Sequence, residues 1–141
     1  MIPKYLNPEA YSFVKLDYSR RSKLQKDPSL ALPNAEKATA ADAKFTGYLF
    51  NPENKDGWSK GVAFSSRLGY NIDNWEAIRK EIFSMAPSYP AAFVEITAYG
   101  TRYEQKIVLY GLKGKPANVV IGWMQNGEKT WLTTAMIKEV G

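Results

Sequence analysis

Lysine, threonine and tyrosine are the side chains that could do chemistry here, because the sequence contains no histidine and no cysteine. Lys60 is the first candidate, and it follows a stretch rich in turn-forming pairs, Asn51-Pro52 and Asp56-Gly57. Ser59 is predicted to cap a helix that carries Lys60 in its first turn. Free N–H groups at a helix N-terminus beside a lysine favour a bound anion such as phosphate. An exposed helix lysine without a ligand explains the same pattern equally well.

Hydroxyl groups and one carboxylate form a second candidate set near a predicted hairpin. Glu95 shares a strand face with Thr97 and Tyr99, and Tyr103 follows on the next strand. A carboxylate beside hydroxyl groups can transfer protons. Two simpler interpretations stay open: threonine and tyrosine are common in strands for their β-propensity, and Glu95 could form a cross-strand ion pair with Lys106.

The last two strands hold further candidates. Thr133 and Thr134 place one hydroxyl on each face of a strand, so only one of them can reach a cleft. Trp123 and Trp131 lie on either side of an Asn-Gly turn, where core or cross-strand packing is favoured over stacking on a base. Four lysines on strands and loops could contact phosphates, although solubility explains each one singly: Lys106, Lys113, Lys115 and Lys129.

Composition bounds the class of protein. The 141 residues are 45% hydrophobic, which is enough for one domain with a packed core and an appended N-terminal segment. The net charge of +5 favours an acidic partner. Without cysteine and histidine there is no disulfide, thiolate nucleophile or zinc site, and we expect no cofactor. No apolar run approaches the roughly 20 residues that span a bilayer, and the N-terminus does not begin a signal peptide. Phosphate-binding loops, Ser-His-Asp triads, metalloprotease motifs and dinucleotide fingerprints are also missing.

These side chains must be positioned by helices that precede a run of strands. Residues 1–43 are predicted to be an N-terminal helical and linker segment, with Asn7 as cap and Pro8 as first helical residue. Residues 44–141 are predicted to form an α+β domain. Its first helix runs from Ser59 to Leu68. The second opens near Asn74 and stops before Pro87, and its buried stripe comprises Trp75, Ile78, Ile82 and Met85.

Four strands are predicted at 92–99, 103–112, 118–125 and 129–138. The short connections between them include Asn126-Gly127, which is typical of a tight hairpin, so the strands must be sequentially antiparallel. We therefore expect an α+β fold in which helices pack on one face of a four-stranded antiparallel meander sheet. The other face of the sheet is then free for function.

An ordered set of short motifs across residues 44–138 resembles a known family. The motifs are Tyr48-Leu-Phe-Asn-Pro-Glu, Gly57-Trp-Ser-Lys, Leu68-Gly-Tyr, Thr97-Ala-Tyr-Gly-Thr-Arg-Tyr, Gly122-Trp and Leu132-Thr-Thr-Ala. They are similar to those of small bacterial domains with an Asn-Pro…Gly-x-Ser-Lys motif. Such domains occur as C-terminal modules of polymorphic and contact-dependent growth-inhibition toxins, and in prophage-associated proteins. Residues 1–43 fall outside the resemblance, and in such a toxin they could be a cell-entry segment or a spacer.

The resemblance implies the ribonuclease fold shared by barnase, EndoU, colicin nucleases and RelE. EndoU enzymes use paired histidines with a threonine; this chain keeps Thr134 and lacks both histidines, so histidine-free anticodon nucleases are the better analogue. The implied function is a bacterial toxin that cleaves RNA, tRNA above all, without a metal. It would reach the cytoplasm of a target cell as part of a larger secreted or cell-surface protein. The implied partners are a cognate immunity protein and, by analogy, a host elongation factor.

On this hypothesis the ribose 2′-hydroxyl attacks its own phosphate and leaves a 2′,3′-cyclic phosphate. Lys60 stabilises the developing negative charge, Thr134 and Thr97 donate hydroxyl groups, Tyr99 positions or stacks a base, and Glu95 is the general base. The RNA-binding residues are Tyr103, Arg102, Lys106 and Trp123. Two alternatives stay open: a non-catalytic nucleic-acid- or protein-binding module from a phage-related operon, which needs no histidine, and a metal-dependent DNase, which needs a carboxylate cluster.

Overall fold

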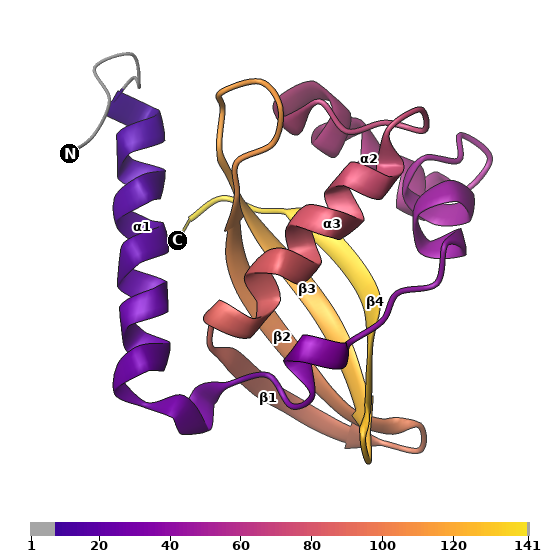
Figure 1. The fold of residues 1–141 in the computed structure, drawn as a ribbon. Coiled ribbons are helices and arrows are strands. Elements are labelled where there is room, and N and C mark those ends of the chain that lie inside the picture. The colour runs from indigo at the N-terminus through magenta and orange to yellow at the C-terminus, as the bar shows by residue number, and fades with distance from the viewer. Residues whose placement is uncertain (1–7, 141) are drawn as a thin grey trace.

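Four strands form an antiparallel meander in which each strand pairs with its neighbours along the chain (Figure 1). The structure is a computed structural model, and it describes residues 8–140. The strands are β1 (Ala91–Thr97), β2 (Gly100–Leu109), β3 (Ala117–Asn126) and β4 (Lys129–Ile137). The helices are α1 (Pro8–Lys26), α2 (Lys55–Leu68) and α3 (Trp75–Met85), with a π-helical turn η3 (Phe45–Leu49) and 3₁₀ turns η1 (Pro28–Leu30), η2 (Ala35–Lys37) and η4 (Ala86–Ser88). The predicted α+β fold class is confirmed.

The hairpin turns follow local hydrogen bonding. The hairpin predicted at Asn126-Gly127 forms, but its turn is shifted by one residue: Asn126 pairs with Lys129, so the turn residues are Gly127 and Glu128, and Gly127 has a φ of 60° at the first of them. The first turn differs from the prediction, because Thr97 pairs with Gly100 and the turn residues are 98 and 99 rather than 100–102. The Thr97 hydroxyl holds this turn by accepting from the Tyr99 N–H at 3.1 Å and donating to the Gly100 carbonyl at 2.9 Å.

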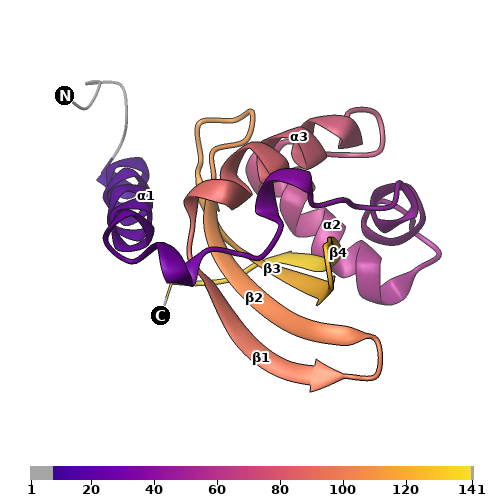
Figure 2. The same ribbon diagram turned by 60° about the horizontal axis from the view of Figure 1, so that its bottom comes forward.

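One face of the sheet carries the hydrophobic core. α3 crosses this face and α2 lies beside β4, as Figures 1 and 2 show from two directions. The predicted stripe on α3 is confirmed: Ile78, Ile82 and Met85 are buried, and the ring of Trp75 stacks on Phe45 with centroids 5.6 Å apart. Burying each such side chain contributes about 1.5–3 kcal/mol, so this layer fixes the position of α3 on the sheet.

α1 stands at the side of the sheet (Figure 2) and is tied to it by the partly buried carboxylate of Asp17. The predicted helix is confirmed from Pro8 onward, and the predicted cap Asn7 lies outside the described residues. Asp17 accepts hydrogen bonds from the hydroxyls of Tyr89 and Tyr110 and from Arg21 at 2.7 Å. Burial raises the pKa of Asp17, but the hydrogen bonds from the two tyrosines and Arg21 outweigh it, so the pKa lies below its ordinary value.

The segment between α1 and η3 is not a free tether. Thr39 N–H donates to the Thr130 carbonyl, and Leu132 N–H donates to the Thr39 carbonyl, both at 2.9 Å, so residue 39 pairs with β4. Leu32 is 2% exposed and belongs to the core. The division of the chain at residues 43 and 44 stays a prediction, although part of the predicted linker packs against the domain.

The second face of the sheet is open at one end and closed at the other. Near the first hairpin, alternate residues of β2 are exposed on it: Arg102, Glu104 and Lys106. Further along, Val108 is fully buried and Val120 is 7% exposed. The surface that the sequence predicted to be free for function is therefore limited to the hairpin half of the sheet.

Candidate functional site

Lys60 and Thr134 meet at the junction of α2 and β4, although 74 residues separate them in sequence. The Lys60 Nζ lies 3.4 Å from the Thr134 Oγ1, 3.3 Å from the Asp56 Oδ2 and 2.5 Å from the Tyr48 hydroxyl. The Tyr48 hydroxyl in turn donates to Asp56. One ammonium, one carboxylate and two hydroxyl groups thus converge in a single cluster, which we call the Lys60 cluster.

The helix that carries Lys60 begins earlier than the sequence predicted. α2 starts at Lys55, and the Asn54 side chain caps it by accepting from the Gly57 N–H at 3.1 Å. Asp56-Gly57 therefore lies within the first turn of the helix. Ser59 is not the cap; its hydroxyl donates to the Asp56 carbonyl at 3.0 Å. Lys60 falls in the second turn, so the predicted anion site at the helix N-terminus is not formed.

Two glycines on α2 bring Tyr48 to Lys60. Gly57 and Gly61 are buried one turn apart and face the backbone of η3. A Cβ at residue 57 would lie 2.1 Å from the Tyr48 carbonyl oxygen, and one at residue 61 would lie 1.7 Å from the Leu49 carbonyl oxygen. Only glycine permits this approach. Gly57, which the sequence analysis placed in a turn, instead lets η3 pack on α2, and the Tyr48 ring centroid lies 5.1 Å from the Lys60 Nζ.

Electrostatics keep both ends of the cluster charged. Burial lowers the pKa of Lys60, but its hydrogen bonds with Tyr48 and Asp56 outweigh burial and raise the pKa above its ordinary value. The hydrogen bonds from Tyr48 and Lys60 lower the pKa of Asp56. The Lys60 side chain is 17% exposed and that of Asp56 is 73% exposed. At neutral pH the cluster therefore presents a fixed, protonated lysine beside an accessible carboxylate.

The other predicted catalytic residues lie on β1, at the edge of the sheet opposite β4, and on the turn that follows β1. The carboxylate of Glu95 forms an ion pair with Arg102, its cross-strand partner on β2. This pair replaces the Glu95–Lys106 pair considered from the sequence. The Thr97 hydroxyl is used within its own turn, and Tyr99 is 76% exposed at the tip of the hairpin.

Sheet geometry separates these residues from the Lys60 cluster. Thr97 is on β1 and Thr134 on β4, three strands away, in cross-strand rows four residues apart. With about 4.8 Å between strands and 3.3 Å per residue, the two threonines are roughly 20 Å apart. The same geometry puts Glu95 about 16 Å from Thr134. The structure therefore brings Lys60 and Thr134 together and leaves Glu95, Thr97 and Tyr99 apart from them.

The predicted RNA-binding residues are divided between surface and core. Lys106 is exposed on the second face, and Tyr103 is half-buried with its ring edge-on to Phe93, centroids 6.4 Å apart. Trp123 is 1% exposed, and its indole N–H donates to Gln105 at 3.1 Å. Its ring is a core element and is not available to stack on a base.

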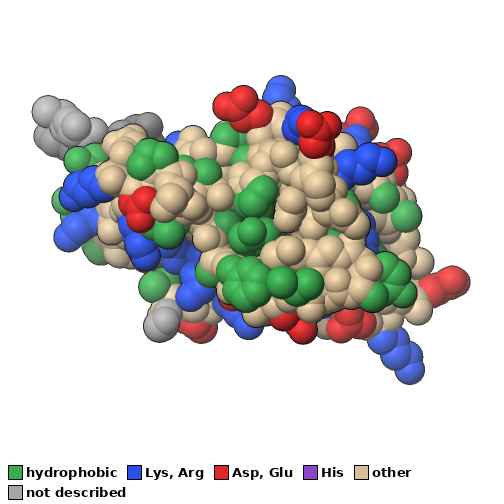
Figure 3. Space-filling view, turned by 90° about the horizontal axis from the view of Figure 1, so that it is seen from below, with side chains coloured by type: hydrophobic (Ala, Val, Ile, Leu, Met, Phe, Trp, Pro, Cys, Tyr) green, Lys and Arg blue, Asp and Glu red, His purple; other side chains and the backbone are tan. Residues whose placement is uncertain are grey.

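Exposed apolar side chains accompany the hairpin. Phe93 is 60% exposed and Ile96 is 76% exposed on β1, one of the two edge strands of the sheet. Seen from below, hydrophobic side chains gather near the middle of this face of the molecule, while lysines and arginines collect at the end where α1 lies (Figure 3). The hairpin end of the sheet is thus more apolar than basic, which does not favour it as a phosphate-binding surface.

Sequence reasoning missed Tyr48 and Asp56 as members of the site. The spacing of Asp56 and Lys60 is an i, i+4 pair on one helix face, and it predicts their contact once the helix is started at Lys55. For Tyr48 the signal was the pair of glycines one turn apart, which indicates close packing of another backbone on α2.

Comparison with known proteins places the chain in a family. Residues 31–139 match the family described as "Domain of unknown function (DUF6883)", which is most of the chain. The chain belongs to this family. None of the curated proteins matches the chain. The match to DUF6883 spans the Lys60 cluster, the sheet and the segment that pairs with β4.

A solved structure shares the fold of this DUF6883 domain. It is a chain of the "Contact-dependent growth inhibition toxin - immunity protein complex from Klebsiella pneumoniae 342", with a TM-score of 0.57 and 18% sequence identity. The match covers 76% of this chain and 98% of that chain. At this identity the likeness shows a shared fold. Among the described residues, no helix is long and apolar enough to cross a membrane.

Proposed function

We propose that this DUF6883 domain is a toxin domain with metal-independent ribonuclease activity, and that the Lys60 cluster is its active site. The observation that carries the proposal is that the hydroxyl groups of Tyr48 and Thr134 converge on the ammonium group of Lys60. A phosphodiester in the transition state gains negative charge on its non-bridging oxygens, and preorganised donors aimed at that charge accelerate the reaction. That the substrate is tRNA is inferred only from the resemblance of the sequence motifs to those of bacterial toxin domains.

The reaction that fits this cluster is internal transesterification. The ribose 2′-oxygen attacks the adjacent phosphorus, a 2′-O–P bond forms, and the bond from phosphorus to the 5′-oxygen breaks. The products are a 2′,3′-cyclic phosphate and a free 5′-hydroxyl. The protonated Lys60 stabilises the charge on the phosphoryl oxygens, and the Thr134 hydroxyl, 3.4 Å from the Nζ, supplies a second donor.

Proton transfer in this proposal belongs to Asp56 and Tyr48, not to Glu95. Asp56 is ionised and exposed, so it accepts the proton that leaves the 2′-hydroxyl. The Tyr48 hydroxyl lies between Lys60 and Asp56 and gives its proton to the departing 5′-oxygen. Because one proton is taken up and one is released, the net charge of the protein is unchanged, and transfer of the proton from Asp56 to Tyr48 restores the starting protonation state.

The proposed partner is a cognate immunity protein. The fold neighbour comes from a toxin–immunity protein complex, and an active ribonuclease would harm the cell that makes it. The net charge of +5 favours an immunity protein with an acidic surface, because complementary potentials speed and orient association. Delivery into a target cell as part of a larger protein belongs to the same proposal.

Incubation of the purified protein with total tRNA in EDTA tests the activity. The proposal predicts endonucleolytic fragments that end in 2′,3′-cyclic phosphate and 5′-hydroxyl groups. Binding of tRNA without cleavage would support the alternative, a non-catalytic RNA-binding module. Cleavage that requires added Mg²⁺ would contradict the metal-independent mechanism, and magnesium-dependent nicking of plasmid DNA would point to a DNase.

A further inference from the structure

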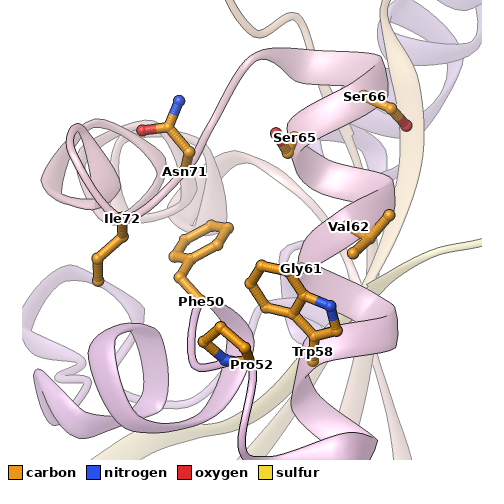
Figure 4. Close-up of a pocket in the computed structure, with 9 residues that line it drawn as sticks. All are labelled: Phe50, Pro52, Trp58, Gly61, Val62, Ser65, Ser66, Asn71 and Ile72. Atoms are coloured by element: carbon orange, nitrogen blue, oxygen red, sulfur yellow. The ribbon is translucent and has the colours of Figure 1, made fainter.

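A cavity of about 420 Å³ opens on the flank of α2 opposite the Lys60 cluster (Figure 4). Phe50 forms its floor at 4% exposed, and Pro52, Trp58, Val62 and Ile72 form its walls. Three of these walls are unusually accessible for large apolar side chains: Trp58 is 39% exposed, Val62 45% and Ile72 48%. Partly exposed aromatic and aliphatic walls around a concave site of this size are typical of a binding site.

The cavity has an apolar end and a polar end. Figure 4 shows Trp58 and Pro52 together at one end, and Ser65 and Asn71 at the other. Within residues 8–140, neither the Ser65 hydroxyl nor the side-chain nitrogen of Asn71 has a hydrogen-bond partner. A site with an aromatic wall and unpaired polar groups at its rim suits a flat heteroaromatic ring whose edge forms hydrogen bonds, more than it suits an alkyl chain.

We propose that this cavity holds a nucleobase of the RNA whose backbone reaches the Lys60 cluster, with the base stacked on Trp58. The inference rests on the proposed ribonuclease function. Unstacked bases of single-stranded RNA are recognised by stacking on aromatic side chains and by hydrogen bonds to their edges. Ser65 and Asn71 supply the edge contacts.

The two sites are close enough for one RNA strand. Trp58 and Lys60 are two residues apart on α2, so they point to opposite flanks of a helix about 10–12 Å across. A strand that follows the helix surface from one flank to the other covers about half of the helix circumference, roughly 16–19 Å, which is about five nucleotides at about 3.4 Å per stacked nucleotide. The exposed side chains of Lys55 and Ser59 lie on the helix surface between the flanks, where a lysine can contact the intervening phosphates. The base in the cavity thus belongs to another nucleotide of the same strand, several positions from the phosphodiester that is cleaved.

Binding of uncleavable RNA tests the inference without requiring catalysis. The probe is a set of fluorescent 2′-O-methyl hexanucleotides, which lack the attacking hydroxyl, with a single abasic site moved along the sequence. Trp58→Ala removes the stacking wall and Val62→Phe fills the cavity. Ile96→Ala, on the far hairpin, is the matched control because Ile96 is also exposed. Thermal unfolding of each variant checks that it is folded.

The expected loss of affinity is about 5- to 150-fold for Trp58→Ala and Val62→Phe, with no change for Ile96→Ala. One abasic position should weaken binding to the wild type by a similar factor and leave binding to Trp58→Ala unchanged. Equal affinity of all variants for the hexanucleotides, or an abasic effect that persists in Trp58→Ala, would overturn the base site. A cavity that holds a protein side chain instead of a base would give the first of these results. Because cleavage is measured separately on tRNA, a wild type that binds the hexanucleotides but never cleaves tRNA would overturn the ribonuclease proposal alone.

Discussion

At the scale of single residues, the Lys60 cluster combines groups that sequence reasoning assigned with groups that it did not. Lys60 and Thr134 were predicted to act together, and they lie 3.4 Å apart. Tyr48 and Asp56 complete the arrangement by holding the ammonium in place and keeping it protonated. The four side chains come from η3, α2 and β4, so small changes in any of these elements should disturb the site.

The two threonines that were predicted as hydroxyl donors should behave differently. Thr134→Val removes a hydroxyl from the Lys60 cluster and should reduce the rate of tRNA cleavage by about 10²–10³-fold. Thr97→Val removes a hydroxyl that serves a turn roughly 20 Å away and should leave the cleavage rate unchanged. Equal losses in both variants, measured as initial rates under the same conditions, would contradict the separation of the two sites.

The general base should be Asp56 rather than Glu95. Asp56→Asn keeps the shape of the side chain but cannot accept the proton, and it should slow cleavage by about 10²–10⁴-fold. Glu95→Gln breaks only the pair with Arg102 and should cleave at the wild-type rate. Single-turnover rates of the two variants distinguish the assignments, and a slow Glu95→Gln with a fast Asp56→Asn would restore Glu95 as the base.

At the scale of elements, the site depends on how closely α2 packs on η3. Gly57→Ala and Gly61→Ala each force a Cβ into a backbone carbonyl, at 2.1 Å and 1.7 Å. We expect each to lower the free energy of unfolding by about 1–3 kcal/mol, because overpacking displaces the backbone, and to reduce cleavage by moving Tyr48. Gly47→Ala is the control, since its Cβ would meet only Ala43 at 3.8 Å. Urea unfolding curves check the effect, and a stable Gly61→Ala would contradict this packing.

The attachment of α1 should depend on pH through Asp17. Its pKa is depressed in the folded state, so its contribution to stability is full above the ordinary pKa of aspartate and is lost as the pH falls through the lowered value. Asp17→Asn should lower the free energy of unfolding at pH 7 by about 1.5–3 kcal/mol and flatten its dependence on pH below about 4. Asp73 is exposed, so Asp73→Asn is the control. Unfolding curves measured from pH 7 downward should give this variant the free energy of unfolding and the pH dependence of the wild type.

Sequence patterns predicted the elements better than the contacts between them. The α3 stripe and the Asn126-Gly127 signal are local, so they placed α3 and the last hairpin, although the turn of that hairpin is Gly127-Glu128. Asp56-Gly57 was interpreted as a turn because local propensity favours one, whereas the Asn54 cap and the packing of η3 keep it helical. Tyr48 could not be assigned to the site from sequence because its role depends on the tertiary contact between η3 and α2. Strand alternation did not reveal that the candidate residues on β1 lie too far from Thr134 on β4 to share a site. That separation depends on the distance across the sheet, which alternation does not report.

At the scale of the whole molecule, the fold separates three surfaces. The Lys60 cluster lies where α2 meets β4, the cavity beside Trp58 lies on the other flank of α2, and the apolar hairpin of β1 and β2 lies at the opposite edge of the sheet. Both surfaces that we assign to RNA therefore include side chains of α2, on its two opposite flanks. The exposed strand β1 belongs to neither of these surfaces.

The rate of tRNA cleavage in EDTA by the wild type and by Lys60→Ala tests the central claim most directly. The wild type should produce 2′,3′-cyclic phosphate ends, and Lys60→Ala should be slower by about 10²–10³-fold while unfolding at the same urea concentration. Lys80→Ala, an exposed lysine on α3, should cleave like the wild type. A Lys60→Ala protein that cleaves as fast as the wild type would contradict the account.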